Sequence, residues 1–301
     1  MNGRRDETAD GDGPRSVGIV TDEEHADLAA DGRAIASELE TRGFRTEPLV
    51  WTKSADPERY DVVLFRTPWD YYTVPDRFQS FLDRLDAAGI EVYNPIDVVR
   101  WNIHKSYLTE LAGAGVETTP TVCFESGEDV SLEAVLAERG WEQAVIKPAI
   151  GAGSEGVWRT SLAEAAADQR RFEDDLSERD TLVQQFLPGI DSGERSIVFV
   201  DGAYSHAWND VPRSDDFSAF AETGVTFDPP ESARSAAYDT LATACRLLGY
   251  EPTDLPYARV DYVDDDGFSL IELELFEPNL ELGIAPEAAE RVAESIASRL
   301  R

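Results

Sequence analysis

Short apolar segments alternate with amphipathic helical segments along the first hundred residues, and this alternation constrains the fold more than any other feature. The hydrophobic pattern predicts strands at residues 16–20, 44–51, 61–65 and 90–93. It predicts helices at residues 27–42 and 76–88, and the glycine that directly follows each of them, Gly43 or Gly89, favours a helix stop. Strands that alternate with helices are typical of a parallel sheet covered by helices. We therefore expect an α/β protein that begins with a parallel-sheet lobe over residues 16–100.

The rest of the chain predicts two more lobes. For residues 101–188 we expect a small central lobe, with helices at 103–114, 132–139 and 162–176 and strands at 119–124, 143–147 and 181–187. For residues 189–301 we expect a C-terminal α+β lobe, with strands at 195–200, 203–209, 257–263 and 268–276 and helices at 233–248 and 286–300. Residues 1–15 are charged, acidic and glycine-rich, and predict a disordered leader.

The chain has 301 residues, with 60 acidic side chains against 27 basic ones and a formal net charge of −33. A protein this negative repels phosphate backbones and anionic membranes, which excludes nucleic acid as the main partner. The acidity is spread along the chain, as in cytoplasmic proteins of extreme halophiles, and we interpret it as an adaptation to concentrated salt. No apolar run approaches the ~18 residues of a membrane span, and no signal peptide follows the N-terminus. We expect a cytoplasmic protein without a membrane partner; a homodimer is left open.

Only three lysines occur in the chain, so each is either a chance survivor or a position where an ammonium is required. Lys147 ends an apolar strand that runs into a glycine-rich turn. Lys105 lies at the start of a predicted helix, and Lys53 has no assigned task. Lys105 and Lys147 therefore lie where a nucleoside triphosphate would need positive charge.

The glycine-rich turn after Lys147 suits the binding of phosphate. Gly151, Gly153 and Gly156 let the backbone approach a ligand and turn several N–H groups toward phosphate oxygens. The lysine precedes the glycines, so the segment is not a Walker A loop, and its place in the chain does not fit a dinucleotide fingerprint. On spacing alone, a plain hairpin turn is the favoured interpretation.

Three carboxylates near the C-terminus lie on two predicted strands joined by a tight turn: Asp261, Glu272 and Glu274. Residues i and i+2 of a strand project from the same face, so Glu272 and Glu274 point together from an otherwise apolar strand. They repel each other unless a cation joins them, and Mg²⁺, which prefers oxygen ligands, is the natural candidate. An edge strand with one wet face is the alternative interpretation. Glu277 and Asn279 are substitutes for either ligand.

In their order along the chain, these segments resemble the ATP-grasp superfamily, and within it the glutathione-synthetase-like and RimK-like ligases, including the ligase type of D-cycloserine biosynthesis. The segments that carry the resemblance are residues 102–105, 145–148 with 151–156, 183–188, 193–196 with 198–202, 257–261 and 271–274. Each motif is degenerate, but their order is specific. The resemblance implies an ATP-grasp fold, with an N-terminal parallel-sheet lobe, a small central lobe and a C-terminal α+β lobe.

The resemblance also implies which residues bind ATP and metal. Lysines would contact the phosphates, the glycine loop would cover the triphosphate, and a hinge would read adenine through backbone groups. The implied ATP-binding set is Lys105, Lys147, Gly151, Gly153, Ser154, Gly156, Gln184, Gln185, Phe186, Leu187 and Glu194. Asp261, Glu272 and Glu274 would hold Mg²⁺ (or Mn²⁺). Many ATP-grasp enzymes have Glu-x-Asn where this chain has Glu-x-Glu, which leaves the metal-binding pair open.

The reaction that the resemblance implies is carboxylate activation. A substrate carboxylate attacks the γ-phosphate, ADP leaves, and an amine then displaces phosphate from the acyl phosphate. Arg259 would neutralise the γ-phosphate or the developing oxyanion, with Lys147 and Arg213 as the other predicted catalytic residues; a structural salt bridge is the alternative for Arg259. We therefore expect an ATP- and Mg²⁺-dependent carboxylate–amine ligase that acts on small molecules. A small-molecule kinase of the same fold and a nucleotide-binding module without turnover are the alternatives.

Three residues after the predicted strand at 61–65 are our candidates for substrate recognition: Arg66, Trp69 and Asp70. Ligands of open α/β sheets bind at the carboxyl ends of the strands, and an arginine can hold a carboxylate with two parallel hydrogen bonds. A buried aromatic turn is the alternative. Arg213 is a second candidate for substrate or phosphate. We interpret the three histidines as structural and the two cysteines as free thiols.

Overall fold

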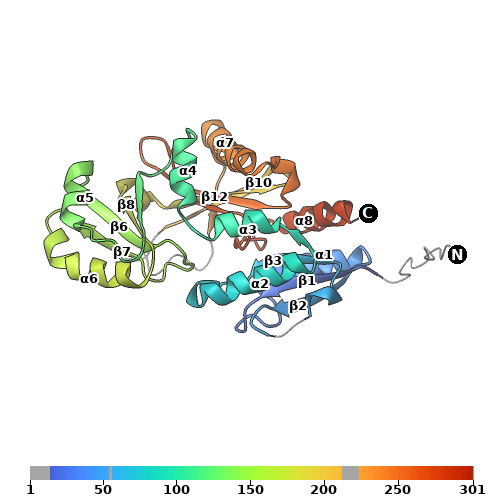
Figure 1. Cartoon of the computed structure of the whole chain (residues 1–301). Coiled ribbons are helices and arrows are strands. Elements are labelled where there is room, and N and C mark those ends of the chain that lie inside the picture. The colour runs from blue at the N-terminus through green and yellow to red at the C-terminus, as the bar shows by residue number, and fades with distance from the viewer. Residues whose placement is uncertain (1–13, 54–55, 212–223, 301) are drawn as a thin grey trace.

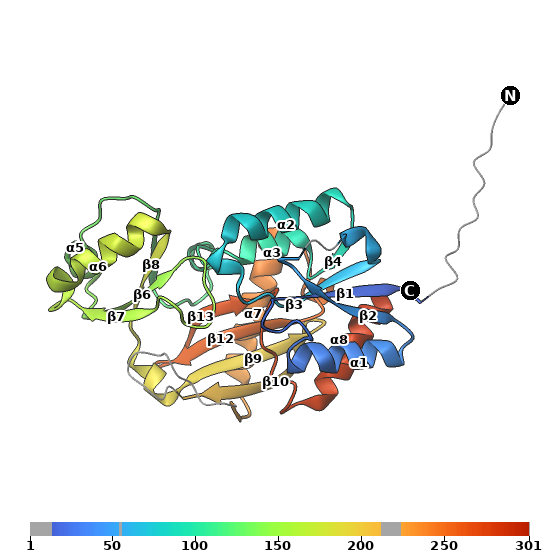
Figure 2. The ribbon, with the colours of Figure 1, turned by 90° about the horizontal axis from the view of Figure 1, so that it is seen from below.

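The computed structural model describes residues 14–53, 56–211 and 224–300. Within these segments the strands form three sheets, each in a lobe of its own (Figure 1). The central lobe projects at one end of the molecule, whereas the N-terminal and C-terminal lobes lie against each other (Figures 1 and 2). The expected α/β architecture, with a parallel first sheet, is confirmed.

The N-terminal lobe is a four-stranded parallel sheet with the strand order β2-β1-β3-β4. Its elements are β1 (Ser16–Thr21), α1 (Ala30–Thr41), β2 (Arg45–Val50), β3 (Val62–Thr67), α2 (Pro75–Ala87) and β4 (Glu91–Tyr93). All residues of β1 and β3 are buried, because helices cover both faces of the sheet. Alternate residues face opposite helices: Val62 and Leu64 share a core with α1, and Val63 and Phe65 share one with α2.

The central lobe is a four-stranded sheet with the order β5-β8-β6-β7, and its neighbouring strands are antiparallel. Its elements are β5 (Thr121–Phe124), α5 (Leu132–Arg139), β6 (Gln143–Pro148), β7 (Trp158–Ser161), α6 (Ala165–Glu178) and β8 (Thr181–Gln185). Helices α5 and α6 cover one face, where Leu136, Phe172 and Val183 belong to a common core. The short strand β7 was not predicted; it pairs with β6, so the glycine-rich segment is the turn of a β-hairpin.

The C-terminal lobe is a five-stranded antiparallel sheet with the order β11-β10-β9-β12-β13. Its elements are β9 (Glu194–Val200), β10 (Ala203–Asp210), β11 (Val225–Thr226), α7 (Glu231–Leu248), β12 (Ala258–Asp264) and β13 (Phe268–Glu274). Helix α7 packs on one face of the sheet. The other face, which carries the alternate residues of β12 and β13, turns toward the remaining lobes.

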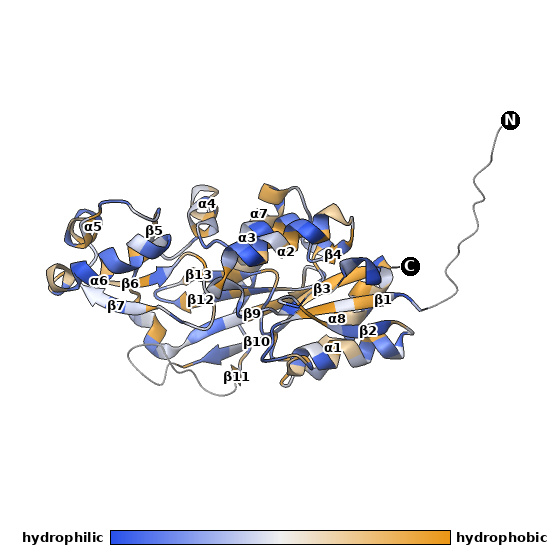
Figure 3. Ribbon diagram, turned by 60° about the horizontal axis from the view of Figure 1, so that its bottom comes forward, coloured by the Kyte–Doolittle hydropathy of each residue, from blue (hydrophilic) through white to orange (hydrophobic). Residues whose placement is uncertain are grey.

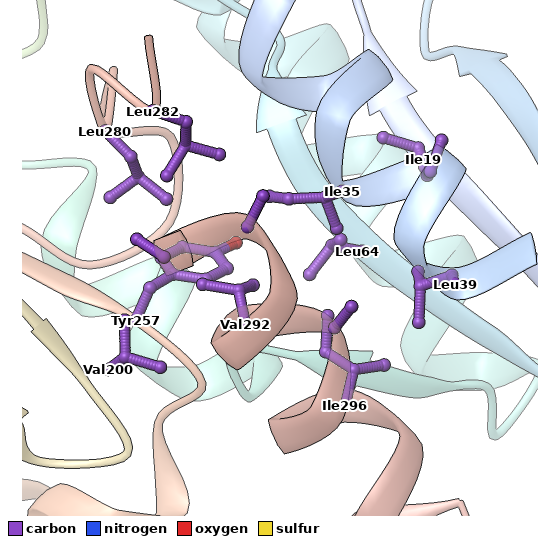
Figure 4. Packing of buried hydrophobic residues seen from close by; sticks show 14 of the residues in the cluster. Ile19, Ile35, Leu39, Leu64, Val200, Tyr257, Leu280, Leu282, Val292 and Ile296 are labelled. Carbon is purple, nitrogen blue, oxygen red and sulfur yellow. The ribbon is translucent and has the colours of Figure 1, made fainter. Parts of the chain in front are cut away.

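The last helix joins the C-terminal lobe to the N-terminal lobe. Helix α8 (Pro286–Arg299) packs against α1, and Ile35 and Leu39 share a core with Val292 and Ile296 (Figure 4). The apolar residues of this region gather on the strands and on the inner faces of the helices (Figure 3). Because the two lobes share one hydrophobic core, they hold the site between them in a fixed geometry. The division of the chain at residues 100 and 188 stays a prediction.

The segment around Lys105 differs from the predicted helix at 103–114. The structure has two short helices there, α3 (Ile96–Asn102) and α4 (Tyr107–Gly113), and Lys105 lies in the turn between them. Asn102 explains the break, because its side chain donates to Leu273 O (2.7 Å) and accepts from Leu275 N (2.7 Å). These bonds hold the end of α3 on β13. They bring Lys105 to the edge of the C-terminal sheet.

The short 3-10 helices complete the fold: η1 (Pro57–Arg59), η2 (Tyr71–Thr73), η3 (Pro188–Ser192) and η4 (Pro252–Asp254). In the described part of the chain, no helix has the length and apolarity needed to cross a membrane. Cys123 and Cys245 are free, which confirms the prediction.

Candidate active site

A large pocket opens where the three lobes meet, with a volume of about 750 Å³. Its central-lobe wall comes from β6, the glycine loop and the end of β8, and its C-terminal wall from β12 and β13. The N-terminal lobe closes it with the loops that follow β1 and β3. The pocket thus has a glycine-loop end, formed by Lys105, Lys147, residues 151–155 and residues 184–187, and an N-lobe end, formed by Asp22, His25, Trp69, Asp70, Glu277, Asn279 and Glu281. The predicted ATP-binding residue Gly156 does not line the pocket.

Lys105 and Lys147 both line the glycine-loop end of the pocket, although 42 residues separate them in the chain. Lys105 donates from Nζ to Gly151 O (3.0 Å) and to the Glu272 carboxylate. Burial works to lower the pKa of Lys105, but Glu272 outweighs it and the net pKa is raised. Burial lowers the pKa of Lys147. Two ammonium groups with little solvent around them form a site for a polyanion.

The glycine loop is a hairpin turn and a wall of the pocket at the same time. Gly153, Ser154 and Gly156 all have positive φ, at 62°, 61° and 74°. A Cβ at Gly156 would lie 3.0 Å from Cγ of Pro148, so a side chain there would be crowded by the proline as well as strained by the positive φ. Gly151, Gly153 and Ser154 line the pocket. The hairpin interpretation and the ligand-binding interpretation are therefore compatible.

The predicted hinge Gln184–Leu187 lines the pocket next to Lys147. The side chain of Gln184 donates to Thr121 Oγ1 (2.9 Å). The backbone N–H groups of Gln185 and Phe186 are already bonded, to Pro120 O (2.8 Å) and Gln143 O (3.1 Å). A nucleobase bound at this hinge would therefore have to hydrogen-bond to groups of the hinge other than these two N–H groups.

Arg259 lies between the predicted metal-binding carboxylates. The register of β12 and β13 pairs Arg259 with Glu274 and Asp261 with Glu272. The Arg259 guanidinium donates to Asp261 from Nε (2.9 Å) and Nη2 (2.8 Å), and also donates to Glu274. Asp261 is fully buried and does not line the pocket, whereas Glu272 and Glu274 do. Across the described residues, no three His, Cys, Asp or Glu side chains form a ready metal cluster.

The carboxylates around Arg259 are strongly perturbed by burial. Burial, followed by the nearby charges of Glu277 and Asp261, raises the pKa of Glu274 well above its usual range. Burial raises the pKa of Glu194 to about 8 and that of Glu277 to about 7. Burial also opposes ionisation of Glu272, but Lys105 and Lys147 outweigh it and lower its pKa. A cation placed among these oxygens would remove their mutual repulsion.

The pocket carries far more negative than positive charge. Ten acidic side chains line it within the described residues: Asp22, Glu24, Asp70, Glu155, Glu194, Asp210, Glu272, Glu274, Glu277 and Glu281. The basic ones are Lys105, Lys147 and Arg259. One or two of these carboxylates, together with phosphate oxygens, would supply the oxygen ligands that Mg²⁺ prefers. Glu272, Glu274 and Glu277 face the pocket with oxygen donors of the type a divalent metal takes, although they do not form a three-ligand cluster by themselves.

The structure separates the three predicted substrate residues. Trp69 and Asp70 line the N-lobe end of the pocket, where burial raises the pKa of Asp70. Arg66 does not line the pocket: its side chain is fully buried, and Nη2 donates to Pro278 O (2.6 Å). In this position its guanidinium cannot grip a substrate carboxylate, because β3 residues alternate between faces and Arg66 points to the side of α1 and Tyr257. For Arg66, the alternative interpretation of a buried turn therefore holds, and its prediction as a substrate-binding residue is wrong. Arg213 lies outside the described residues.

The N-lobe end contains residues that sequence analysis missed. Asp22 and His25 follow β1, and Asp22 accepts from His25 N (2.7 Å) with its carboxylate 2.8 Å from Nδ1. The His25 ring lies edge-on to Trp69, with ring centroids 5.2 Å apart. The rule that drew attention to the end of β3 applies equally to the end of β1, and it would have found Asp22. Glu281 had no signal, since only the tertiary fold turns it inward.

The other two histidines lie outside the pocket. His206 is buried, with Nε2 2.7 Å from Leu280 O, and burial lowers its pKa. His104 has Nδ1 2.8 Å from Ser106 Oγ and Nε2 3.2 Å from Asp180 Oδ2. This contact ties the turn before α4 to the start of β8. His206 and His104 thus connect elements, while His25 is the histidine that reaches the site.

Comparisons with known proteins agree with this geometry. A family model described as D-cycloserine synthetase DcsG, N-terminal domain, matches residues 17–94, and one described as prokaryotic glutathione synthetase, ATP-grasp domain, matches residues 116–235. The cycloserine biosynthesis protein DcsG of Streptomyces lavendulae is 31% identical over 302 residues, which cover 95% of this chain and 99% of that protein.

Two solved structures share the fold. The crystal structure of D-cycloserine synthetase DcsG has a TM-score of 0.85 at 28% identity and covers 95% of this chain and 100% of that chain. A RimK domain ATP-grasp protein from Sphaerobacter thermophilus has a TM-score of 0.66 at 18% identity, over 93% of this chain and 98% of its own, and shares the fold alone. The three lobes and the pocket between them are thus those of an ATP-grasp enzyme.

This chain belongs to the ATP-grasp ligase family that includes DcsG. The resemblance inferred from the order of its motifs is confirmed. It is a ligase of the class that joins a carboxylate to an amine with ATP.

Proposed function

We propose that this protein is an ATP- and Mg²⁺-dependent carboxylate–amine ligase that acts through an acyl phosphate. The observation that carries the proposal is the pairing, in one pocket, of two largely enclosed lysines with an excess of carboxylates. A triphosphate needs the positive charge of the lysines, and a divalent metal needs the oxygen atoms of the carboxylates. A pocket for an ordinary apolar ligand would need neither.

In this proposal the glycine-loop end binds ATP. Lys147 and Lys105 hold phosphate oxygens, and the loop of residues 151–156 covers them with backbone N–H groups. Glu272 and Glu274, with Glu277 beside them, would hold Mg²⁺, which supplies charge neutralisation to the phosphates when bound. Binding of a polyanion would draw Lys105 away from Glu272, its partner in the structure described above. Glu272 would then be released for the metal.

The chemistry begins with attack of a substrate carboxylate oxygen on the γ-phosphorus of ATP. The bond from that phosphorus to the β,γ-bridging oxygen breaks, and its electrons leave with ADP. The amine then attacks the acyl carbon, loses a proton, and displaces inorganic phosphate. Arg259 is oriented by Asp261 and Glu274, so its guanidinium is fixed before charge develops on the transferred group. Lys147 supplies the second fixed positive charge.

The substrate would occupy the N-lobe end, next to Trp69, His25 and the acidic side chains around them. The relative DcsG, whose match covers 95% of this chain, is named for cycloserine biosynthesis, and we infer a small amino-acid-derived substrate here too. The volume of about 750 Å³ accommodates a nucleotide and a small molecule together.

The test is a phosphate-release screen over pairs of small acids and amines, in molar KCl, with product analysis by mass spectrometry. We expect ADP and phosphate only when a matching acid is present, and a coupled product when the amine is added. The screen includes the formation of cycloserine. A stable phosphorylated product without an amine would instead indicate a kinase. Background ADP formation with every pair would indicate a nucleotide-binding module.

We further propose that the enzyme works in a cytoplasm rich in salt. The support is compositional: 60 acidic residues against 27 basic ones, spread over the chain. Salt screens the repulsion between surface carboxylates, so the folded state should gain stability as KCl rises. The midpoint of thermal unfolding, measured in about 0.1 M KCl and in molar KCl, tests this. A midpoint that falls as KCl rises would contradict the proposal.

A further inference from the structure

The segment of residues 276–282, which we call the strap, follows β13 and crosses the N-lobe end of the pocket. Glu277, Asn279 and Glu281 of the strap line the pocket. The intervening leucines, Leu280 and Leu282, are buried in the core shared with α1 and α8 (Figure 4). The strap is therefore two-sided, with its polar residues toward the site and its apolar residues toward the protein.

Side chains from several elements, and not a neighbouring strand, hold the backbone of the strap. Three backbone carbonyls accept from side chains: Glu277 O from Trp69 Nε1 (2.9 Å), Pro278 O from Arg66 Nη2 (2.6 Å) and Asn279 O from Arg259 Nη1 (2.9 Å). Two backbone N–H groups, Leu280 N and Leu282 N, donate to the two carboxylate oxygens of Asp31 (2.7 and 3.0 Å). His206 Nε2 lies 2.7 Å from Leu280 O. Successive backbone groups are thus fixed without a sheet. This is unusual, because most backbone groups bond within secondary structure.

Arg66 and Asp31 form the part of this attachment that comes from the interior of the N-terminal lobe. Arg66 is 0% exposed and Asp31 is 7% exposed, and Nη2 lies 4.0 Å from Oδ2. The Arg66 guanidinium also lies over the Tyr257 ring, with its carbon 4.7 Å from the ring centroid. A buried charge is costly unless it is paired and hydrogen-bonded. Here both charges direct their short hydrogen bonds to the strap.

The strap also contains a backbone conformation that needs support from outside. Glu281 has φ at +48°, in the left-handed region that side chains other than glycine rarely adopt. The two N–H groups on either side of it, Leu280 N and Leu282 N, are the ones that the Asp31 carboxylate binds. A strained residue persists when its surroundings over-determine it. Asp31 therefore holds the turn that directs Glu281 into the pocket.

We propose that Arg66 and Asp31 are positioning residues, which fix the strap from the N-terminal lobe so that Glu277, Asn279 and Glu281 face the pocket. The role in substrate binding rests on the ligase function proposed above, whereas the attachment itself does not. Neither residue touches the pocket. Each acts through the backbone of the strap.

The physical consequence is a selective one. Lys147, the glycine loop and the hinge belong to the central lobe, whereas Arg66 and Asp31 direct their hydrogen bonds to the strap. Release of the Leu280–Leu282 part of the strap, which Asp31 holds, should therefore weaken binding at the N-lobe end and change nucleotide binding by the central lobe much less. A loss of general stability would affect both ends.

The experiment compares four variants of the full chain: Asp31→Ala, the conservative Asp31→Asn, Arg66→Met and the control Leu39→Ala. Leu39 lies in α1, as Asp31 does, and belongs to the same core, but Figure 4 shows it on the far side from Leu280 and Leu282. The control therefore lowers stability without removing a strap bond. The first measurement is hydrogen exchange of the peptide that contains residues 279–284, and the second is the KM for the acid against the KM for ATP.

For Asp31→Ala we expect exchange at the Leu280 and Leu282 amides to be at least about tenfold faster, since both lose their acceptor. The KM for the acid should rise about tenfold, while the KM for ATP changes less than about twofold. Asp31→Asn keeps one acceptor oxygen and should restore part of both effects. Arg66→Met should raise the acid KM in the same direction. Leu39→Ala should change neither the exchange of the strap nor the ratio of the two KM values.

Unchanged strap exchange in Asp31→Ala and Arg66→Met would overturn the proposal, as would an equal rise in both KM values that Leu39→Ala reproduces. If Asp31→Ala does not fold, Asp31→Asn carries the same comparison. The exchange measurement needs no turnover, so faster exchange in a protein that forms no product would leave the positioning role standing and reject the ligase function. Normal turnover with unchanged exchange of the strap would leave the ligase function standing and reject the positioning role.

Discussion

The two ends of the pocket are assembled in different ways. The glycine-loop end comes from continuous stretches of the central lobe: Lys147 and residues 151–156 form one hairpin, and residues 184–187 follow the neighbouring strand. The N-lobe end comes from the ends of β1 and β3 and from the strap, which are over 200 residues apart. Apart from Lys105, which the bonds of Asn102 to β13 bring in, the first end is built by local chain geometry. The second is built by tertiary contacts.

Charge divides the two ends as well. Both pocket lysines lie at the glycine-loop end, whereas the N-lobe end carries Asp22, Asp70 and Glu281 and, among its described residues, no lysine or arginine. The glycine-loop end thus suits an anion, and the N-lobe end suits a group that tolerates or carries positive charge. Substitutions at the two ends should therefore separate nucleotide effects from substrate effects.

The largest expected effect is at the glycine-loop end. Lys147→Ala should lower kcat/KM by at least about a hundredfold, because a fixed buried charge on the phosphates is lost. Steady-state phosphate release measures this, and nucleotide affinity by calorimetry should weaken in parallel. The matched control is Lys53→Ala, the same change at an exposed lysine with no contact to the pocket. Equal activity in both variants would remove Lys147 from the site.

A smaller effect is expected where the two ends meet. Glu277→Gln should lower turnover about tenfold at low Mg²⁺ and less at high Mg²⁺, because one anionic ligand or its electrostatic support is removed. A titration of rate against free Mg²⁺ measures this. Glu133→Gln, on the exposed surface of α5, is the matched control. A Mg²⁺ dependence identical to that of the unmodified protein would place Glu277 outside the metal site.

At the N-lobe end, Trp69→Phe should raise the KM for the acid about fivefold with little change in the KM for ATP. The aromatic surface is kept, but the hydrogen bond from Nε1 to Glu277 O is lost, and one such bond is worth about 1 kcal/mol. Initial rates at saturating ATP measure this. Trp141→Phe, in the core of the central lobe, controls for the loss of an indole. Equal shifts in both KM values would show that the two ends are not separable.

The smallest effect concerns pH and the far side of the strap. Burial lowers the pKa of His206, so the folded state resists protonation and the unfolded state takes up the proton more readily. The contribution of neutral His206 to stability is therefore present above about pH 6.5, its unfolded pKa, and is lost as pH falls below it. Urea midpoints at pH 7.5 and 5.5 measure this. In His206→Gln the urea midpoint should fall less between pH 7.5 and pH 5.5 than it does in the unmodified protein. An equal fall in both proteins would contradict the stabilising role of neutral His206.

The glycine-loop end could be predicted because its chemistry is local. A lysine at a strand end, glycines in the next turn and carboxylates at i and i+2 can be recognised without knowledge of distant contacts. The same locality explains the accuracy of most strands and helices. The break between α3 and α4 was missed because Asn102 bonds to β13, and β7 was missed because only its pairing with β6 defines it.

The N-lobe end could be predicted only in part. Trp69 and Asp70 were found from their place after a strand, but the same argument put Arg66 in the site. A residue at a strand end can point to either face of the sheet, and the packing against Tyr257 and the strap decides which. Asp31 gave no signal at all, since its partners Leu280 and Leu282 are about 250 residues away.

The amino-acid sequence by itself determined the order of the elements, the acidic composition, the family and most of the residues that line the glycine-loop end of the pocket. It could do so because hydrophobic periodicity, charge and short motifs act over a few residues. Only the tertiary structure decided that Arg259 is held between Asp261 and Glu274, and that Arg66 serves the strap and not the pocket. The physical reason is that burial fixes which face each side chain takes and which partners remain within hydrogen-bonding distance.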